Sequence, residues 1–445
     1  MSSTTINSAI PSCEAIAALF DEKSGTISPA IYADPALYEL ELERVFGRSW
    51  LVVAHESQLP NPNDFLSSYM AEDPVIVIRQ KDGSVKVMLN QCRHRGMKLC
   101  RVDQGRARGF ICSYHGWAYD MAGNLVNVPM QERSFIGLDK SKWGVRQARV
   151  DTYKGLIFAT WNAEAPSLRE YLGETALYLD AVLDRSEGGT EAIGGIVKWT
   201  IPCNWKFAAE QFASDMYHGG FSHSSPQIAA AGDQPMADQS LVPSRQFRSD
   251  RGHGTGFFVS DSQWGYRISQ TAELVEGFDP TKTLERITKH SGQARADVMA
   301  QHITIFPNFS VFAGMDTARI WHPRGPDSIE IWAFGLVDKA ASPAEKEQAR
   351  LSTLRTFSPA GTWEQDDGEN WVEIQRVLKG REARKTVLNI QMGMDEPKDL
   401  DPNYPGTINL AFAEEAARGF YGHWQKLMMD VDGSATREVY AHAAE

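Results

Sequence analysis

The sequence predicts an α+β protein made of a small all-β domain and a larger domain built on an antiparallel sheet. The chain has 445 residues, which is too long for one ordinary hydrophobic core. Its hydrophobic content of 42% and charged content of 23% are typical of a soluble globular protein. The spacing of its apolar residues changes twice along the chain, from helical to strand-like and then to a mixture of both.

Composition argues against several functions. The net charge of −12 disfavours a nucleic-acid-binding surface, which needs clustered lysine and arginine to neutralise phosphates. The first residues lack the basic and apolar parts of a signal peptide, and no apolar run approaches the ~18 residues of a membrane span. We therefore expect a cytoplasmic protein. An odd number of unevenly spaced cysteines predicts no disulfide framework: Cys13, Cys92, Cys100, Cys112 and Cys203.

Local patterns place the elements in order along the chain. Residues 14–46 have helical spacing, whereas residues 50–161 contain short β-rich runs. Asp82-Gly83 predicts a hairpin turn between two of these runs, and residues 122–124 predict a second hairpin. The remaining two thirds mix strands with helices, which predicts an antiparallel sheet in an α+β domain.

These patterns divide the chain into three parts. We expect the N-terminal part to pack on the last part, which would make the β-rich block an insertion. We expect an N-terminal helical segment at residues 1–47, the β domain at residues 48–166 and the α+β domain at residues 167–445.

Two Cys-His pairs are the most specific feature of the sequence. Cys92 and His94 are followed after 17 residues by Cys112 and His115. Thiolate and imidazole together suit zinc or an iron–sulfur centre. In a Rieske [2Fe–2S] centre two cysteines hold one iron and two histidines hold the other, and these four residues match that inventory. A structural zinc site is the alternative, but its paired ligands have a different usual spacing. Cys13, Cys100 and Cys203 fall outside the pattern and are expected to be buried thiols.

A second metal site is suggested by Asp215, His218 and His223. If residues 204–218 form one helix, a polar stripe follows one of its faces, and Gly219-Gly220 then loosens or ends that helix so that His223 turns back. Two neutral imidazoles need one carboxylate to complete the facial triad that binds Fe(II) and leaves positions open for O₂. The members of the stripe are Asn204, Ala208, Gln211, Asp215 and His218.

The carboxylate is expected from a second helix, residues 362–380. Its apolar stripe runs through Trp371, Ile374 and Leu378. Asp367 lies four residues before Trp371 and so on the inward face, whereas Asp366 projects from the polar face. Asp367 is therefore the better third ligand. In the alternative interpretation both aspartates only complement the helix dipole and both histidines are core residues. A Rieske cluster nearby favours the metal site, because the cluster needs an electron acceptor.

The motifs CRHRG, CSYHGW, NWKFAAEQFASDMYHGGFSH and EQDDGENWVEIQ resemble those of the α subunits of aromatic-ring-hydroxylating dioxygenases. Gln211-Phe212 and the ending AFAEEAARGFYGHW resemble the biphenyl, toluene and phenylpropionate branch. This resemblance implies a Rieske domain inserted into a helix-grip catalytic domain. It also implies an α3β3 hexamer with a small β subunit, and electrons that pass from NADH through a reductase and a Rieske-type ferredoxin to the cluster.

The reaction implied by the resemblance is cis-dihydroxylation of an arene by O₂, giving a cis-dihydrodiol. Asp215 matches the position that bridges a cluster histidine, here His115, to the iron ligand His218 of a neighbouring subunit. The sequence departs from the branch at residues 219–226 and 312–316, which border the pocket in the family. By match to the motifs, the pocket candidates are Gln211, Phe212, Met216, Gly219, Met315, Phe357 and Trp363.

Two other functions stay open at this point. A Rieske monooxygenase or demethylase uses the same two metal sites on another substrate, and a pure electron-transfer protein or a zinc-stabilised binding module needs no second site. No nucleic acid or membrane partner is expected. The remaining histidines have no informative spacing and are expected to be structural: His55, His253, His290, His302, His322, His423 and His442.

Overall fold

The computed structural model describes most of the chain and divides it into two compact units. The larger unit is formed by Met1–Val45 with Arg169–Glu445, and the smaller by Phe46–Leu168. No helix in the described residues is long and apolar enough to cross a membrane. His442 lies outside the described residues, which are 11–231, 243–258, 280–298, 301–396 and 404–431.

The smaller unit consists mainly of short antiparallel strands in three sheets. The sheets have the strand orders β6-β5-β4-β7, β11-β12-β3 and β10-β9-β8. The predicted turn at Asp82-Gly83 joins β5 to β6, and residues 122–124 join β9 to β10, so both hairpins are confirmed. The elements are β3 (Leu51–His55), β4 (Asp64–Met70), β5 (Asp73–Arg79), β6 (Val85–Leu89), β7 (Gln104–Arg106), β8 (Gly109–Ile111), β9 (Ala118–Asp120), β10 (Leu125–Asn127), α3 (Gln131–Ser134), β11 (Arg149–Tyr153) and β12 (Leu156–Thr160).

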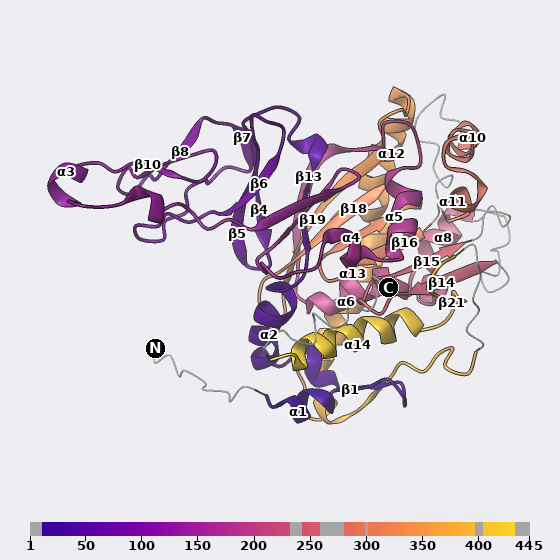
Figure 1. Cartoon of the computed structure of the whole chain (residues 1–445). Helices are drawn as coiled ribbons and strands as arrows, with labels where there is room; N and C mark the ends of the chain where they lie inside the picture. Colours follow the sequence, from indigo (N-terminus) through magenta and orange to yellow (C-terminus); the bar gives the residue numbers. More distant parts are fainter. Residues whose placement is uncertain (1–10, 232–242, 259–279, 299–300, 397–403, 432–445) are drawn as a thin grey trace. The chain divides into compact units, whose positions relative to one another are not determined.

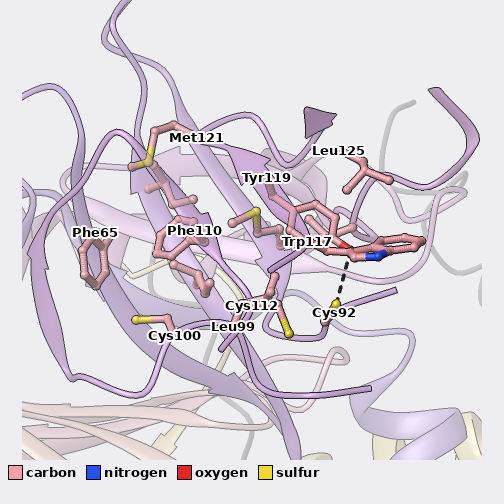
Figure 2. Close-up of a cluster of buried hydrophobic side chains, with 14 of the residues drawn as sticks. Phe65, Cys92, Leu99, Cys100, Phe110, Cys112, Trp117, Tyr119, Met121 and Leu125 are labelled. Atoms are coloured by element: carbon pink, nitrogen blue, oxygen red, sulfur yellow. Dashed lines mark hydrogen bonds between the residues drawn. The ribbon is translucent and has the colours of Figure 1, made fainter. Parts of the chain in front are cut away.

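A cluster of buried hydrophobic side chains lies within the smaller unit (Figure 2). Phe65 and Phe110 pack edge to face, with ring centroids 5.3 Å apart. Cys92 and Cys112 are buried in the same cluster, with exposed fractions of 1% and 2%. Burying a large apolar side chain contributes about 1.5–3 kcal/mol, so this cluster gives the cysteine loops a rigid base.

The larger unit is built on one eight-stranded antiparallel sheet (Figure 1). Its order is β13-β19-β18-β17-β16-β15-β14-β21, and every neighbouring pair is antiparallel. The predicted α+β fold class is confirmed. The strands are β13 (Thr190–Ile201), β14 (Ser244–Arg248), β15 (Gly254–Phe258), β16 (Gln301–Ile305), β17 (Phe309–Phe312), β18 (Thr317–Pro323), β19 (Ile329–Asp338) and β21 (Thr407–Leu410).

Helices pack on this sheet and position the functional side chains. Helix α6 contacts β15 to β18, and α14 contacts α6, β14 and β15. Helix α12 contacts β13, β19 and α13. Asp367 of α13 lies 3.3 Å from His218, which follows the end of α6 by four residues. The helices are α4 (Leu168–Leu172), α5 (Thr175–Leu183), α6 (Trp205–Ser214), α7 (Gly219–Ser222), α8 (Ser224–Ala231), α10 (Pro280–Ser291), α11 (Gln293–Asp297), α12 (Pro343–Phe357), α13 (Thr362–Leu378) and α14 (Glu415–Met429).

The N-terminal segment is less helical than its spacing predicted. It forms α1 (Cys13–Ala17), a hairpin of β1 (Phe20–Asp21) and β2 (Thr26–Ile27), and α2 (Pro35–Glu41). Cys13 is exposed at the start of α1, not buried as expected, whereas Cys100 and Cys203 are buried. Strand β20 (Leu388–Asn389) extends the hairpin. Gly25, at a φ of +60°, allows the tight turn that interrupts the pattern, and Pro35 starts a new helix where a helix tolerates proline.

A buried polar cluster fixes α2 against α6 and α14. The Glu41 carboxylate accepts hydrogen bonds from Lys206 Nζ at 2.5 Å, from Trp205 Nε1 at 2.7 Å and from Trp424 Nε1 at 2.8 Å. Both members of the ion pair are fully buried. Removing one partner would leave an uncompensated buried charge, which costs several kcal/mol.

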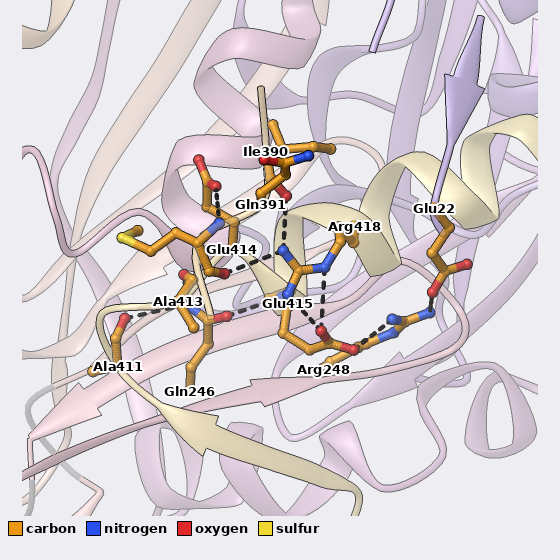
Figure 3. Close-up of polar contacts among 12 residues, drawn as sticks. Glu22, Gln246, Arg248, Ile390, Gln391, Ala411, Ala413, Glu414, Glu415 and Arg418 are labelled. Atoms are coloured by element: carbon orange, nitrogen blue, oxygen red, sulfur yellow. Dashed lines mark hydrogen bonds and ion pairs between the residues drawn. The ribbon is translucent and has the colours of Figure 1, made fainter. Parts of the chain in front are cut away.

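A second polar network ties the start of α14 to its surroundings (Figure 3). Arg418 pairs with Glu415 at 2.6 Å and donates to the carbonyl of Ile390 at 2.7 Å. Glu415 also binds Arg248 at 2.7 Å, and Arg248 pairs with Glu22 at 2.6 Å. The network therefore links the N-terminal hairpin, β14 and α14 within the larger unit.

Acid is expected to destabilise the larger unit through buried His253. Its Nε2 donates to the carbonyl of Tyr171 at 2.9 Å, and its Nδ1 accepts the N–H of Phe306 at 3.0 Å, so the ring is held neutral. Burial lowers the pKa of His253 to about 4. Because the unfolded chain takes up this proton near pH 6.5 and the folded chain only near pH 4, the stabilisation is complete above pH 6.5. About 3 kcal/mol of it is lost between these two values.

The measurement is the melting temperature of the wild type and of His253→Gln at pH 7.5 and pH 5. The glutamine variant should start lower at pH 7.5 and lose less on acidification. An equal loss in both proteins would contradict the role of His253.

Candidate metal centres and arene pocket

The two Cys-His loops of the smaller unit have matching backbone geometry. The carbonyls of Cys92 and Cys112 each accept the N–H of a glycine four residues later, at 2.9 Å. Cys92 N–H donates to the carbonyl of Met97, and Cys112 N–H to that of Trp117, both at 2.8 Å. Both glycines have positive φ, as this tight turn requires. Two similar turns therefore present one cysteine and one histidine each.

The four side chains of these loops meet the demands of a binuclear cluster. The rings of His94 and His115 pack edge to face with centroids 4.5 Å apart. His115 is exposed, whereas both cysteines are buried. His94 Nδ1 is buried and has no hydrogen-bond partner in the described residues. These loops do not supply three ligand atoms close enough for one ion; in the described residues such a group occurs at His218, His223 and Asp367. Four donor atoms that lie farther apart than the ligands of a single ion are suited to a [2Fe–2S] cluster, in which they bind two irons.

The second site is formed by three side chains from two parts of the larger unit. His218 and His223 flank the short helix α7, and Asp367 lies in the second turn of α13. The Nε2 atoms of the two histidines are 3.2 Å apart. Asp367 Oδ1 is 3.3 Å from Nε2 of His218 and 3.2 Å from Nε2 of His223. Two imidazoles and one carboxylate thus converge on one point, as a facial triad requires.

Neighbouring carboxylates orient the two imidazoles. Asp366 Oδ2 is 3.1 Å from Nδ1 of His223, and Asp215 Oδ2 is 3.3 Å from Nδ1 of His218. A proton on each Nδ1 leaves each Nε2 as a lone-pair donor towards the common point.

The electrostatics of the site favour a bound cation. Burial works against charge on Asp367, but the adjacent imidazoles of His218 and His223 outweigh it and lower the pKa of Asp367. Burial also opposes charge on His218, yet Asp215 and Asp367 hold the pKa of that ring well above its usual range. Three carboxylates therefore surround two imidazoles, and the buried Oδ1 of Asp367 has no hydrogen-bond partner among the described residues. A divalent metal ion satisfies this demand for positive charge.

The structure corrects four expectations about the helices at this site. Helix α6 ends at Ser214, so Asp215 and His218 are not part of one stripe with Gln211. The Asp215 carboxylate accepts the N–H of His218 at 3.0 Å, and this local bond replaces the next helical turn. Gly219-Gly220 therefore begins a helix instead of ending one.

The other two corrections concern α13. Asp366 is not on a purely polar face, because it contacts His223. Ile374 is 40% exposed, and the inward position is taken by buried Gln375. Gln375 accepts the N–H of Asn204 at 2.8 Å and donates to the carbonyl of Tyr32 at 3.1 Å. A glutamine with two backbone partners replaces the apolar residue that the periodicity predicted.

An apolar cavity adjoins the second site. Six of the seven predicted pocket residues line it, namely Gln211, Phe212, Met216, Gly219, Phe357 and Trp363. The seventh predicted pocket residue, Met315, is not among the described residues that line the cavity. It is buried in the 3-10 turn Ala313–Met315. The side chains of Asp215, His218, His223 and Asp367 also reach this cavity.

Sequence reasoning missed several lining residues. Phe312 belongs to the segment that departs from the family pattern, which was a usable signal, but Gln227 and Phe258 had none. His302 was expected to be structural, and it lies on the cavity wall instead. Its position depends on β16 packing under α6, and a one-dimensional pattern does not contain that contact.

Comparisons with known proteins identify the family of each unit. Residues 169–430 match the family model of the ring-hydroxylating alpha subunit catalytic domain, and residues 49–154 match that of the Rieske [2Fe-2S] domain. The biphenyl 2,3-dioxygenase α subunit of Rhodococcus jostii is 53% identical over 427 residues, covering 94% of this chain and 92% of that protein. The benzene 1,2-dioxygenase α subunit of Pseudomonas putida is 53% identical over 432 residues, covering 95% of each.

Among solved structures, a naphthalene 1,2-dioxygenase with indole bound in its active site has a TM-score of 0.86 and 33% identity, with 96% of each chain covered. A chain with a Rieske domain, this catalytic domain and this likeness is a ring-hydroxylating oxygenase α subunit, an oxidoreductase that uses a [2Fe–2S] cluster and a mononuclear iron. The chain belongs to the ring-hydroxylating α-subunit family, in the branch of the biphenyl and benzene dioxygenases, as its motifs predicted.

Proposed function

We propose that this chain performs the cis-dihydroxylation of an aromatic hydrocarbon of the biphenyl, alkylbenzene or polycyclic type, with Fe(II) held by His218, His223 and Asp367. The observation that carries the proposal is the convergence of these three side chains beside an apolar cavity, in a chain that also has a Rieske domain. A mononuclear iron there supplies reductive activation of O₂. The product is a cis-dihydrodiol, the first intermediate of arene catabolism.

The residues of the chain prepare this chemistry. Asp366 holds a proton at Nδ1 of His223, so that the ring presents Nε2 to the metal. Gln211 is fixed by Trp371, whose Nε1 donates to Gln211 Oε1 at 2.7 Å, and its amide nitrogen lies 3.4 Å from Nε2 of His218. Phe212, Phe357 and Trp363 supply the apolar wall that an arene needs and exclude water from the reaction.

We propose that Cys92, His94, Cys112 and His115 hold the Rieske cluster, within domain boundaries close to residues 48 and 166. Family members are α subunits of multicomponent dioxygenases. For this chain we propose an α3β3 hexamer with a small β subunit, and electrons supplied from NADH through a reductase and a Rieske-type ferredoxin. Because NADH is the proposed electron source, we propose that this protein acts in the cytoplasm.

Asp215 is proposed to connect the two metal sites across subunits. Its carboxylate lies beside Nδ1 of His218 and is only partly buried, so it can also accept a bond from His115 of the partner subunit. Asp215→Asn should retain iron and cluster but lower the rate of arene oxidation about 100-fold, since coupling alone is lost.

The check is rapid-mixing measurement of cluster reoxidation, with metal content measured alongside. Asp250→Asn is the matched control, because its side chain is 80% exposed on the same unit. Normal reoxidation in Asp215→Asn would remove the bridge assignment.

Isotope labelling tests the reaction itself. The purified α subunit, with its β subunit, ferredoxin and reductase, is supplied with NADH, biphenyl and ¹⁸O₂. A dihydrodiol that carries both atoms of one ¹⁸O₂ molecule is expected. A phenol or an aldehyde with a single label would instead identify a monooxygenase or demethylase, and no oxidised product from a panel of arenes would reject the substrate class.

A further inference from the structure

His302 brings a polar group to the wall of the apolar cavity and has no place in the metal site. It lies in β16 and lines the cavity beside Phe212 and Phe312. Both phenyl rings pack edge-on against its imidazole, with centroids 6.5 and 6.1 Å away. These contacts fix the plane of the imidazole ring.

One hydrogen bond determines the tautomer of this imidazole. Its Nδ1 lies 2.9 Å from the backbone carbonyl of Phe212. Helix α6 ends two residues later, at Ser214, so this carbonyl is one of the last in the helix and needs a donor from outside it. A carbonyl oxygen can only accept, so Nδ1 must carry the hydrogen.

The second ring nitrogen is then an acceptor. In neutral imidazole with hydrogen on Nδ1, Nε2 carries a lone pair. Burial lowers the pKa of His302, which keeps the ring neutral. Nε2 makes no hydrogen bond to any residue in the described part of the chain. By contrast, Gln211 Oε1 already accepts from Trp371, and the Asp215 carboxylate is held by His218.

We propose that Nε2 of His302 accepts a hydrogen bond from those arenes that carry an N–H or O–H donor, so that the cavity binds them better than a wholly apolar cavity of the same size would. An apolar wall alone disfavours such a donor, because the donor loses water on entry without gaining a partner. The acceptor would also orient the ring and so select which ring edge meets the iron. This inference rests on the proposed function in one respect, because it takes the cavity to be the place where the arene binds.

Binding to the oxidised holoenzyme without reductant tests the inference, because no turnover occurs. Indole and indene form the matched pair, since they differ by an N–H in place of a CH₂. The ratio of their dissociation constants is measured by calorimetry in the wild type, His302→Phe and His302→Gln. The phenylalanine variant should shift the ratio about three- to tenfold towards indene, the worth of one neutral hydrogen bond. Glutamine keeps an acceptor and should retain much of the indole preference.

An unchanged ratio in His302→Phe would overturn the proposal. A crystal structure of the wild type with indole gives a second arm that does not depend on folding of a variant. The indole nitrogen within about 3.2 Å of Nε2 supports the proposal, and an indole nitrogen directed at another acceptor rejects it. If indole binds as expected but reductant and O₂ yield no oxidised arene, the proposed function fails while the inference about His302 stands.

Discussion

Replacing His223 by alanine is expected to lower arene oxidation about 1,000-fold, equivalent to about 4 kcal/mol of barrier, while the colour of the Rieske cluster stays intact. His223 is one of the three proposed ligands, and its side chain is buried, with an exposed fraction of 3%. The mononuclear iron should therefore be lost or become inactive. The two irons of the cluster lie in the other unit and should remain.

Metal and acid-labile sulfide analysis beside the rate measurement checks this prediction. The variant should fall from about three to about two irons per chain with sulfide unchanged. His290→Ala is the control, because its side chain is 38% exposed and 3.9 Å from its nearest carboxylate. It should keep all three irons and full activity. Full activity in His223→Ala would exclude the proposed triad.

Replacing Cys112 by alanine should abolish the cluster. As a result, the rate of NADH-dependent arene oxidation should fall by at least about 99.9%. Cys112 is buried among apolar side chains, and no other thiol stands on its loop. The mononuclear iron receives no electrons in this variant, but its own site is untouched. Indole should therefore bind with the wild-type dissociation constant, which separates loss of electron delivery from loss of the pocket.

The matched control is Cys100→Ala, a buried cysteine of the same hydrophobic cluster that lies outside the two loops. It should retain the visible absorption and the EPR signal of the cluster. Loss of the cluster from Cys100→Ala, or its retention in Cys112→Ala, would contradict the ligand assignment.

Features set by neighbours in the sequence were predictable. The Cys-His loops are such features, because each turn is closed by a glycine four residues after its cysteine. Helical periodicity also predicted that Asp367, rather than Asp366, points inward. The side chain of Asp367 is buried, with an exposed fraction of 1%. The eight-stranded sheet could be expected as antiparallel, but its order could not, because β21 pairs with β14 across more than 150 residues.

Features that depend on side-chain bonding or distant packing were missed. Helix α6 ends early because the carboxylate of Asp215 accepts the N–H of His218. Helix propensities do not describe this side-chain hydrogen bond. Asp366 supports His223, a partner 143 residues away in the sequence. His302 has no motif of its own, and its role appears only when the end of α6 supplies a carbonyl to its ring. Gln375 similarly replaces an expected apolar residue with two backbone bonds.

The buried Glu41–Lys206 pair has a consequence for the order of folding during synthesis. Phe46–Leu168 is continuous, so the smaller unit has its whole chain as soon as Leu168 has left the ribosome. The larger unit needs Glu41 from the start of the chain, Lys206 from the middle and Trp424 near the end. Glu41 therefore lacks Lys206 until nearly half of the chain has been made, and it lacks Trp424 until almost all of the chain has been made. Domains generally fold in the order they are made, so the electron-carrying unit is complete first and the oxygenating unit closes last.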